Sequence, residues 1–428
     1  MFKITKILNQ SSKKMLTNIS WVMFLELINS LIPLIVIPYI TRTVGASGYG
    51  AFVVAYNIIS YANVIVIYGF RYSGTKKVAI LEACIPQLSH LFSCILLGRV
   101  FLLLIAFSGS ITYLYLTDME SNYLSLVLCL FTMVLATALQ QSYMYQGLQN
   151  MKPLVVCNAI GQVGFIVCTF IFVKSQADLN SYCLFYGLGY LVSNSLSIVL
   201  LNRKYGIGFH WPSMKSVFLE LKEGWILFLT AAMTTITSAI SVTVLAQYMP
   251  SEDVGIYDGM NKIIQIVVVL YTPIMQNLYP FFCKKYIESF DKGYQTVKKV
   301  GWIVLIFFTL FLLGIYLLRK PLIMIILGSE FLRYNQVIIP LAINFIFGIV
   351  DNFLGVQILV ATGNEALYAK AFLLYSFISV TITVFLTKQY FVWGAAVANP
   401  LSAAIFTIIL ICMVWHVKQK MKVSKKGM

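Results

Sequence analysis

Long apolar runs separated by short polar gaps are the dominant pattern along this chain of 428 residues. An α-helix of about 20 apolar residues is long enough to cross the hydrocarbon core of a bilayer. The pattern predicts twelve such helices, at residues 19–42, 50–70, 88–114, 122–145, 153–173, 180–201, 224–248, 255–279, 300–318, 336–360, 366–387 and 394–416. Alternating ten-residue segments of the outer-membrane barrel type are absent from the pattern, so the predicted fold class is an all-α polytopic membrane protein.

The composition supports a membrane protein and narrows its chemistry. Hydrophobic residues make up 60% of the chain and charged residues only 11%, whereas soluble domains carry about 25% charged residues. The net charge of +16 would suit nucleic acid, but the basic residues lie in the gaps between apolar runs, so no nucleic-acid partner is predicted. The eight cysteines are scattered without a C-x-x-C spacing, and the three histidines are isolated, which predicts no metal site and no catalytic site. No nucleotide-binding P-loop occurs, and no cofactor is predicted.

Lysine and arginine are unevenly shared between the two sides of the predicted membrane. With the N-terminus in the cytoplasm, 23 of the 31 basic residues fall on its side and six on the opposite side. The other two, Arg99 and Lys262, lie inside spans. Because cytoplasmic loops carry an excess of basic residues, both termini are predicted to be cytoplasmic and the number of spans to be even.

One cytoplasmic connection divides the chain. In residues 213–223 the apolar side chains recur at helical spacing, and charged residues take the other face; the apolar positions are Met214, Val217, Phe218 and Leu221. This predicts an amphipathic helix in the membrane interface. The predicted domains are an N-terminal lobe at 1–205 with six spans, a linker at 206–223, and a C-terminal lobe at 224–428 with six spans.

A short internal repeat supports two related lobes. Residues 44–50 and 249–255 align without gaps at an offset of 205, which places Gly50 on Gly255. Each segment leads into a span of the same direction, so the two six-helix halves are predicted to be pseudo-symmetric, with parallel topology. Transporters often use such repeats and bind their substrate at the repeat interface.

Charged residues inside spans are the strongest candidates for function, because charge at membrane depth is costly. Asp258 and Lys262 lie four residues apart on one helix face, with Asn261 and Gln265 beside them. Lys262 is a candidate for binding a phosphate. Asp258 either holds Lys262 in place or exchanges with it during transport. The alternative for both is an internal ion pair.

Three further charged residues lie within or just inside spans: Arg99, Glu26 and Asp351. Arg99 is a second candidate phosphate ligand, with the alternative that it snorkels to the cytoplasmic surface. A buried carboxylate can take up and release a proton, so Asp258, Glu26 and Asp351 are candidate ion-coupling residues, with H⁺ or Na⁺ as the candidate coupling ion.

Polar residues inside the spans form stripes, including Asn57 and Tyr61 in the second span. Such faces predict a hydrated interior whose amides and tyrosine rings suit a sugar-rich ligand. The alternative for any single residue is a hydrogen bond between helices, which uses the same side chains.

The N-terminal part of the chain resembles a known family. The motifs are Asn18-Ile-Ser-Trp21, Ile37-Pro-Tyr-Ile-Thr-Arg42, Val44-Gly45, Tyr49-Gly50, Tyr68-Gly-Phe70 and Lys76-Lys77. They resemble the Wzx-type polysaccharide (O-antigen) flippases of the multidrug/oligosaccharidyl-lipid/polysaccharide exporter superfamily. The twelve spans, the two halves and the linker extend the resemblance over the whole chain.

The resemblance implies a non-enzymatic flippase in the bacterial inner membrane. Such proteins move undecaprenyl-diphosphate-linked oligosaccharides from the cytoplasmic to the periplasmic leaflet by alternating access around a cationic cavity. The implied partners are this lipid-linked substrate and membrane lipids, with a polysaccharide polymerase and a chain-length regulator as candidates. A cation-coupled multidrug exporter of the same fold is the alternative, but a net cationic cavity disfavours it. A membrane enzyme such as a polymerase is disfavoured because the predicted outer loops are all short.

In related lipid flippases, cations on the first, second and eighth spans contact the diphosphate. Lys262 on the eighth span fits this pattern. The chain departs from it elsewhere, because the first span offers Glu26 and the second span has Asn57 and no internal cation. The predicted diphosphate site therefore depends on Lys262 with Arg99 and Arg71.

Overall fold

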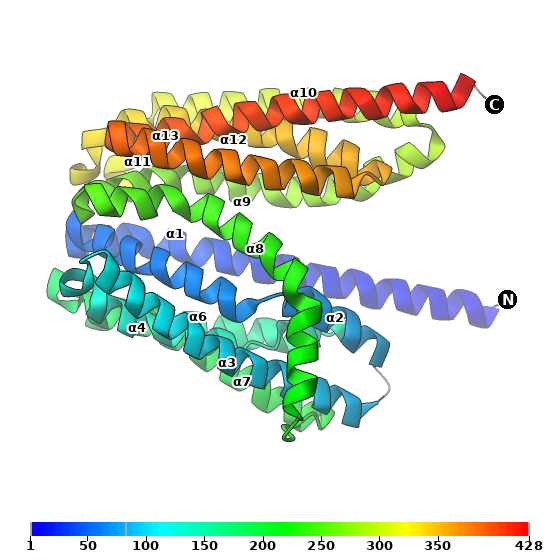
Figure 1. Cartoon of the computed structure of the whole chain (residues 1–428), viewed down its shortest axis with the longest axis horizontal. Helices are drawn as coiled ribbons and strands as arrows, with labels where there is room; N and C mark the ends of the chain where they lie inside the picture. Colours follow the sequence, from blue (N-terminus) through cyan, green and yellow to red (C-terminus); the bar gives the residue numbers. More distant parts are fainter. Residues whose placement is uncertain (1, 82–83, 427–428) are drawn as a thin grey trace. The chain divides into compact units, whose positions relative to one another are not determined.

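The computed structural model describes the backbone of residues 2–81 and 84–426. It does not describe the side chains of residues 2–19, 22, 26, 27, 29–31, 33, 34, 120 and 420–426. Within the described ranges the chain is helical with short connections and contains no strand (Figure 1). The predicted all-α class is therefore confirmed.

The first part of the chain contains these helices: α1 (Phe2–Ile67), α2 (Phe70–Leu81), α3 (Ile85–Leu116), α4 (Glu120–Ala138), α5 (Ser142–Gly147), α6 (Lys152–Phe172), the 3-10 turn η1 (Gln176–Asp178), α7 (Leu179–Tyr205) and α8 (Met214–Tyr248). The second part contains α9 (Ser251–Glu288), α10 (Phe290–Leu317), α11 (Arg319–Ile326), η2 (Ser329–Val337), α12 (Ile338–Leu354), the π-helical turn η3 (Gly355–Leu359), the 3-10 turn η4 (Val360–Thr362) and α13 (Glu365–Lys426).

In the described part of the chain, ten helices are long and apolar enough to cross a membrane. The two longest helices, α1 and α13, each contain a break, α1 at Gly45, where φ is 71°, and α13 at Phe391, where φ is 52°. Each break falls between two predicted spans, so α1 and α13 each contain the positions of two predicted spans. A left-handed backbone is easy for glycine and costly for phenylalanine.

Both segments of the internal repeat contain a helix boundary. The helix of α1 breaks at Gly45, and at the offset of 205 the corresponding residue is Pro250. Met249 and Pro250 separate α8 from α9, and Pro250 is the residue directly before α9. Proline lacks the amide hydrogen that would continue the preceding helix, so different residues end the equivalent helices in the two halves.

The chain divides into two compact units, residues 1–236 and 237–428. Helix α8 begins in the first unit and ends in the second. The predicted lobe boundaries around the linker at 206–223 stay a prediction.

The first unit is built from the second half of α1 together with α3, α4, α6 and α7, with α4 and α6 both packed on α7. Helices α6 and α7 approach closely at Gly161 and Gly189. A Cβ atom at Gly161 would collide with the Gly189 carbonyl oxygen, and one at Gly189 would lie 2.9 Å from the Cβ of Phe165. Small residues at such crossings are typical of membrane helices.

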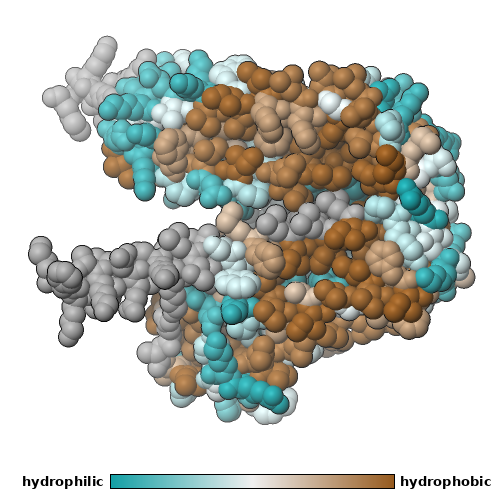
Figure 2. All heavy atoms as spheres, turned by 180° about the vertical axis from the view of Figure 1, so that it is seen from behind, coloured by the Kyte–Doolittle hydropathy of each residue, from teal (hydrophilic) through white to brown (hydrophobic). Residues whose placement is uncertain are grey.

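In the second unit α12 packs on α13, α10 and α9. Both units present hydrophobic side chains on their surfaces, and hydrophilic residues gather toward the helix ends (Figure 2). The exposed apolar side chains lie along the middle of the helices, where a bilayer would surround them.

The predicted amphipathic linker helix forms the first turns of α8 and is continuous with the following span. Its apolar side is only partly covered by protein. Val217 is buried, whereas Met214 and Phe218 are exposed. The exposed pair fits a helix whose remaining apolar surface contacts lipid.

Candidate functional site

Asp258 and Lys262 form the predicted ion pair on α9. The Nζ atom of Lys262 lies 3.9 Å from Oδ2 of Asp258, and their side chains are 34% and 10% exposed. This separation is longer than the 2.7–3.2 Å of a hydrogen bond. The pair is therefore a loose electrostatic contact in which the lysine remains accessible while the carboxylate is largely covered.

Three contacts fix the part of α9 that carries this pair. Asp253 pairs with Arg333 of η2 at 3.2 Å. Asn399 of α13 donates a hydrogen bond of 3.2 Å to the Tyr257 hydroxyl. A Cβ atom at Gly259 would lie 2.9 Å from the ring of Phe331, so glycine lets η2 pack closely there. These contacts lie within three turns of Lys262 and limit how far its backbone can move.

Asn261 and Gln265 share α9 with this pair. Asn261 is half-buried and Gln265 is exposed. Their predicted contact with a ligand stays a prediction.

Asp351, a predicted coupling residue, lies on α12 and accepts a hydrogen bond from the Thr407 hydroxyl of α13 at 2.5 Å. Six residues later, Gln357 in the π-helical turn η3 donates to Asn352 at 3.2 Å and to the Met275 carbonyl at 3.5 Å. The widened turn thus brings a polar side chain between α9 and α12. Such π-turns often occur at functional positions.

The structure gives Arg99 a role that the sequence did not predict. Its side chain is 1% exposed, which makes the snorkelling alternative wrong. The guanidinium carbon lies 5.7 Å from the Phe70 ring centre and 5.5 Å from that of Tyr143. Nη1 donates a hydrogen bond to the Gln140 carbonyl, where the chain leaves α4 before α5 begins. Arg99 therefore stabilises a helix end that has lost its intrahelical partners.

The predicted site residues are divided between the two units of the chain. Asn57 is buried and Tyr61 half-buried in the second half of α1, and Arg71 is exposed on α2. These three and Arg99 belong to the first unit, and Lys262 to the second. Glu26 lies outside the described side chains. Asp258 and Lys262 are in direct contact.

An aromatic cluster in the first unit joins residues from three helices. Tyr56 of α1 meets Tyr186 of α7 edge-on at 5.7 Å between ring centres, and Tyr190 lies 5.6 Å from Tyr186. Phe165 of α6 meets Tyr186 at 5.2 Å. The sequence signal was the four-residue spacing of the tyrosines on α7, but their partners on other helices could not be predicted from it.

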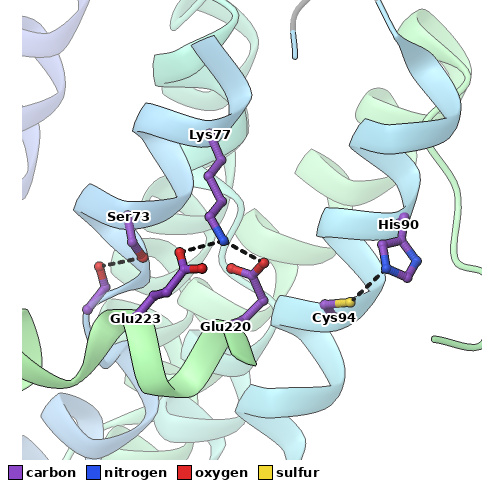
Figure 3. A network of polar contacts seen from close by, with 7 residues as sticks. Ser73, Lys77, His90, Cys94, Glu220 and Glu223 are labelled. Atoms are coloured by element: carbon purple, nitrogen blue, oxygen red, sulfur yellow. Dashed lines mark hydrogen bonds and ion pairs between the residues drawn. The ribbon is translucent and has the colours of Figure 1, made fainter. Parts of the chain in front are cut away.

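The structure also contains a cluster of charged side chains that was not predicted from the sequence (Figure 3). Lys77 of α2 lies 2.7 Å from a carboxylate oxygen of Glu220 and 2.7 Å from one of Glu223, both in the first turns of α8. We call this contact the Lys77 bridge. It fastens the linker segment of α8 to the segment that follows the second span. In the sequence, the feature that could have indicated this bridge is the pair of acidic residues, Glu220 and Glu223, on the polar face of residues 213–223.

Comparisons with known proteins place this architecture in a family. Two relatives are named as candidate O-antigen transporters. The one from Shigella dysenteriae is 24% identical over 90% of this chain and 95% of its own length. The one from Escherichia coli (strain K12) is 22% identical over 95% of this chain and 98% of its own length.

Solved structures share the fold at low sequence identity. The lipid II flippase MurJ in an inward closed conformation matches with a TM-score of 0.71 and 13% identity, over 94% of this chain and 87% of that one. An inward-facing multidrug resistance transporter of the MATE family matches with a TM-score of 0.66 and 12% identity, over 93% of this chain and 99% of that one. Residues 15–285, more than half of the chain, match the family described as polysaccharide biosynthesis protein. The chain therefore belongs to this family of polysaccharide biosynthesis proteins.

Proposed function

We propose that this protein is a flippase that moves an undecaprenyl-diphosphate-linked oligosaccharide, an O-antigen or similar surface-polysaccharide unit, from the cytoplasmic to the periplasmic leaflet. The observation that carries the proposal is the family match over residues 15–285. Two relatives named as candidate O-antigen transporters, aligned over nearly their whole lengths, support it. The protein acts as a transporter and not as an enzyme.

The physical problem for such a flippase is to carry a charged and hydrated headgroup through hydrocarbon. A phosphate at that depth needs a cation and hydrogen-bond donors to replace its water. Lys262 supplies an accessible ammonium group inside an apolar helix. Because Asp258 contacts it only loosely, a diphosphate with greater negative charge competes effectively for the lysine.

The transport cycle proposed here is alternating access, coupled to H⁺ or Na⁺. Asp258 and Asp351 are the described carboxylates proposed for coupling, and Glu26 is a third candidate. When the diphosphate takes over Lys262, Asp258 loses its counter-charge and gains affinity for a cation. Substrate binding and ion binding would thereby be linked at one pair of residues.

The proposed location is the bacterial inner membrane, with both termini in the cytoplasm. A polysaccharide polymerase and a chain-length regulator are the proposed protein partners on the periplasmic side. Cells that lack this chain should accumulate lipid-linked oligosaccharide in the cytoplasmic leaflet and lose surface polysaccharide, and the wild-type chain should restore it. Unchanged surface polysaccharide in the cells that lack the chain would contradict the proposal.

A further inference from the structure

Two apolar grooves lie along the same pair of helices, α10 and α12, within the second unit. One has a volume of 260 Å³ and the other 380 Å³. Along α10 the first groove ends at Leu305 and the second begins at Thr309, one turn later. Along α12 they meet between Ile349 and Ile346. We call the two grooves together the α10–α12 seam.

The seam runs along most of the predicted span at 300–318. Its lining residues on α10 run from Tyr294 to Tyr316, which is about 33 Å at 1.5 Å per residue. The part from Tyr294 to Lys298 precedes the span, on the side predicted to be cytoplasmic. Helix α10 also faces outward: Trp302, which lines the seam, is 56% exposed. In the second groove Leu313 is 51% exposed, so both grooves have a lining side chain that is open toward lipid.

A cation stands at each end of the seam. Lys418 of α13 lies 4.3 Å from the ring centre of Tyr294, and Lys298 lines the groove beside it. At the other end Arg319 lies 4.3 Å from the ring centre of Tyr316. Arg319 is held by hydrogen bonds to Asn335 at 3.1 Å and to the Tyr316 carbonyl at 2.9 Å. Cations at both ends of an apolar groove suit an anionic lipid whose headgroup is found first on one side and then on the other.

Packed aromatic rings form a support beneath the seam. Phe308 and Phe345 meet at 5.9 Å, and Tyr271 of α9 lies 5.4 Å from each of them. Interlocked rings of this kind resist collapse, so the grooves persist without an occupant. At Gly301 an added Cβ atom would only touch the Phe353 ring at 3.4 Å, so the depth of the first groove depends on the missing side chain.

We propose that the α10–α12 seam holds the polyprenyl chain of the lipid-linked substrate, with the cations at its two ends contacting the anionic headgroup on either side of the membrane. This proposal rests on the proposed function. A hydrocarbon chain gains little by leaving lipid for an apolar surface. Selection of a polyprenyl chain over ordinary acyl chains therefore comes from the fit to a fixed groove and from charge-assisted contacts at its ends.

A photocrosslinking experiment tests this occupant directly. The photoreactive amino acid p-benzoylphenylalanine replaces Leu305, which lines the seam, or Ile303, which is 59% exposed on the same helix and does not line it. The full chain is placed in vesicles of phosphatidylethanolamine and phosphatidylglycerol that contain undecaprenyl diphosphate. Mass spectrometry then measures the ratio of polyprenyl to phospholipid adducts. The expected ratio is several-fold higher at Leu305 than at Ile303.

Charge variants test the ends of the seam in the same vesicles. Lys298→Gln combined with Lys418→Gln should lower the polyprenyl ratio measured at Leu305 toward that at Ile303. Lys299→Gln, an exposed neighbour that does not line the groove, is the matched control and should leave the ratio unchanged. Equal effects of the double variant and of the control would overturn the assignment of a headgroup contact at this end.

The outcomes separate the seam from the proposed function. Equal ratios at Leu305 and Ile303, in vesicles where the wild-type chain flips lipid-linked oligosaccharide, would mean that ordinary phospholipid fills the seam, and would overturn this inference alone. If the wild-type chain fails to flip the oligosaccharide, the proposed function fails. A raised ratio at Leu305 would in that case still establish a polyprenyl-binding seam.

Discussion

Lys262 is a cation held loosely inside an apolar helix, and its neighbours explain why it is available. Asp258 neutralises it at 3.9 Å without a hydrogen bond. Their four-residue spacing predicted that both residues lie on the same face of one helix. The accessibility of the lysine and the burial of the carboxylate could not be predicted, because they depend on η2 and α13, which lie far away in the sequence.

Replacing Lys262 by alanine should remove surface polysaccharide while the protein still inserts in the membrane. Hydrogen bonds to charged groups contribute about 1.5–3 kcal/mol, so substrate binding should weaken about ten- to a hundredfold. Quantitative staining of surface polysaccharide in cells measures the effect. Lys388→Ala, at an exposed lysine, is the matched control and should behave as wild type. Normal polysaccharide from the Lys262→Ala chain would remove this residue from the mechanism.

Arg99 illustrates how a charge inside a span can serve the fold. Arg99→Met should lower the melting temperature of the purified protein, because the Gln140 carbonyl loses its donor and two ring contacts are lost. An unsatisfied buried group costs about 1–3 kcal/mol. A melting temperature equal to that of wild type, together with lost transport, would instead support the predicted contact with the substrate.

At the scale of elements, the hydrophobic pattern predicted the long apolar helices, because length and apolar content decide which helices can cross a membrane. It did not predict the break between α4 and α5, which falls inside the predicted span at 122–145. Contacts between elements were not predictable in the same way. The Lys77 bridge joins residues 143 positions apart or more, and the α10–α12 seam arises from the packing of two helices that are not consecutive in the chain. The π-helical turn at Gly355–Leu359 likewise left no signal in the periodicity.

Breaking the Lys77 bridge should loosen the start of α8. In Lys77→Met, hydrogen exchange of the backbone amides in residues 214–223 should be about fivefold faster, as expected from about 1 kcal/mol for a partly exposed ion pair. Lys76→Met changes an exposed neighbouring lysine and should leave the exchange rates as they are. Equal rates in wild type and Lys77→Met would show that the apolar contacts alone hold this segment.

At the scale of the whole molecule, the distribution of basic residues predicts an orientation that the helices alone do not give. Residue 175 lies in a predicted periplasmic loop and residue 213 in the predicted cytoplasmic linker. In a chain without its eight native cysteines, Ser175→Cys should react with a membrane-impermeant maleimide added to the periplasm. Ser213→Cys should react only after the inner membrane is opened. The reverse labelling pattern would invert the proposed topology.

The most direct test is transport by the purified full-length chain in sealed vesicles. Undecaprenyl-diphosphate-linked oligosaccharide is placed in both leaflets, and a membrane-impermeant glycosidase is added outside. With the wild-type chain, nearly all of the oligosaccharide should become cleavable over time, and with Lys262→Ala only the outer half. Cleavage that stops at the outer half with the wild-type chain, both with and without a proton or sodium gradient, would contradict the proposed flippase.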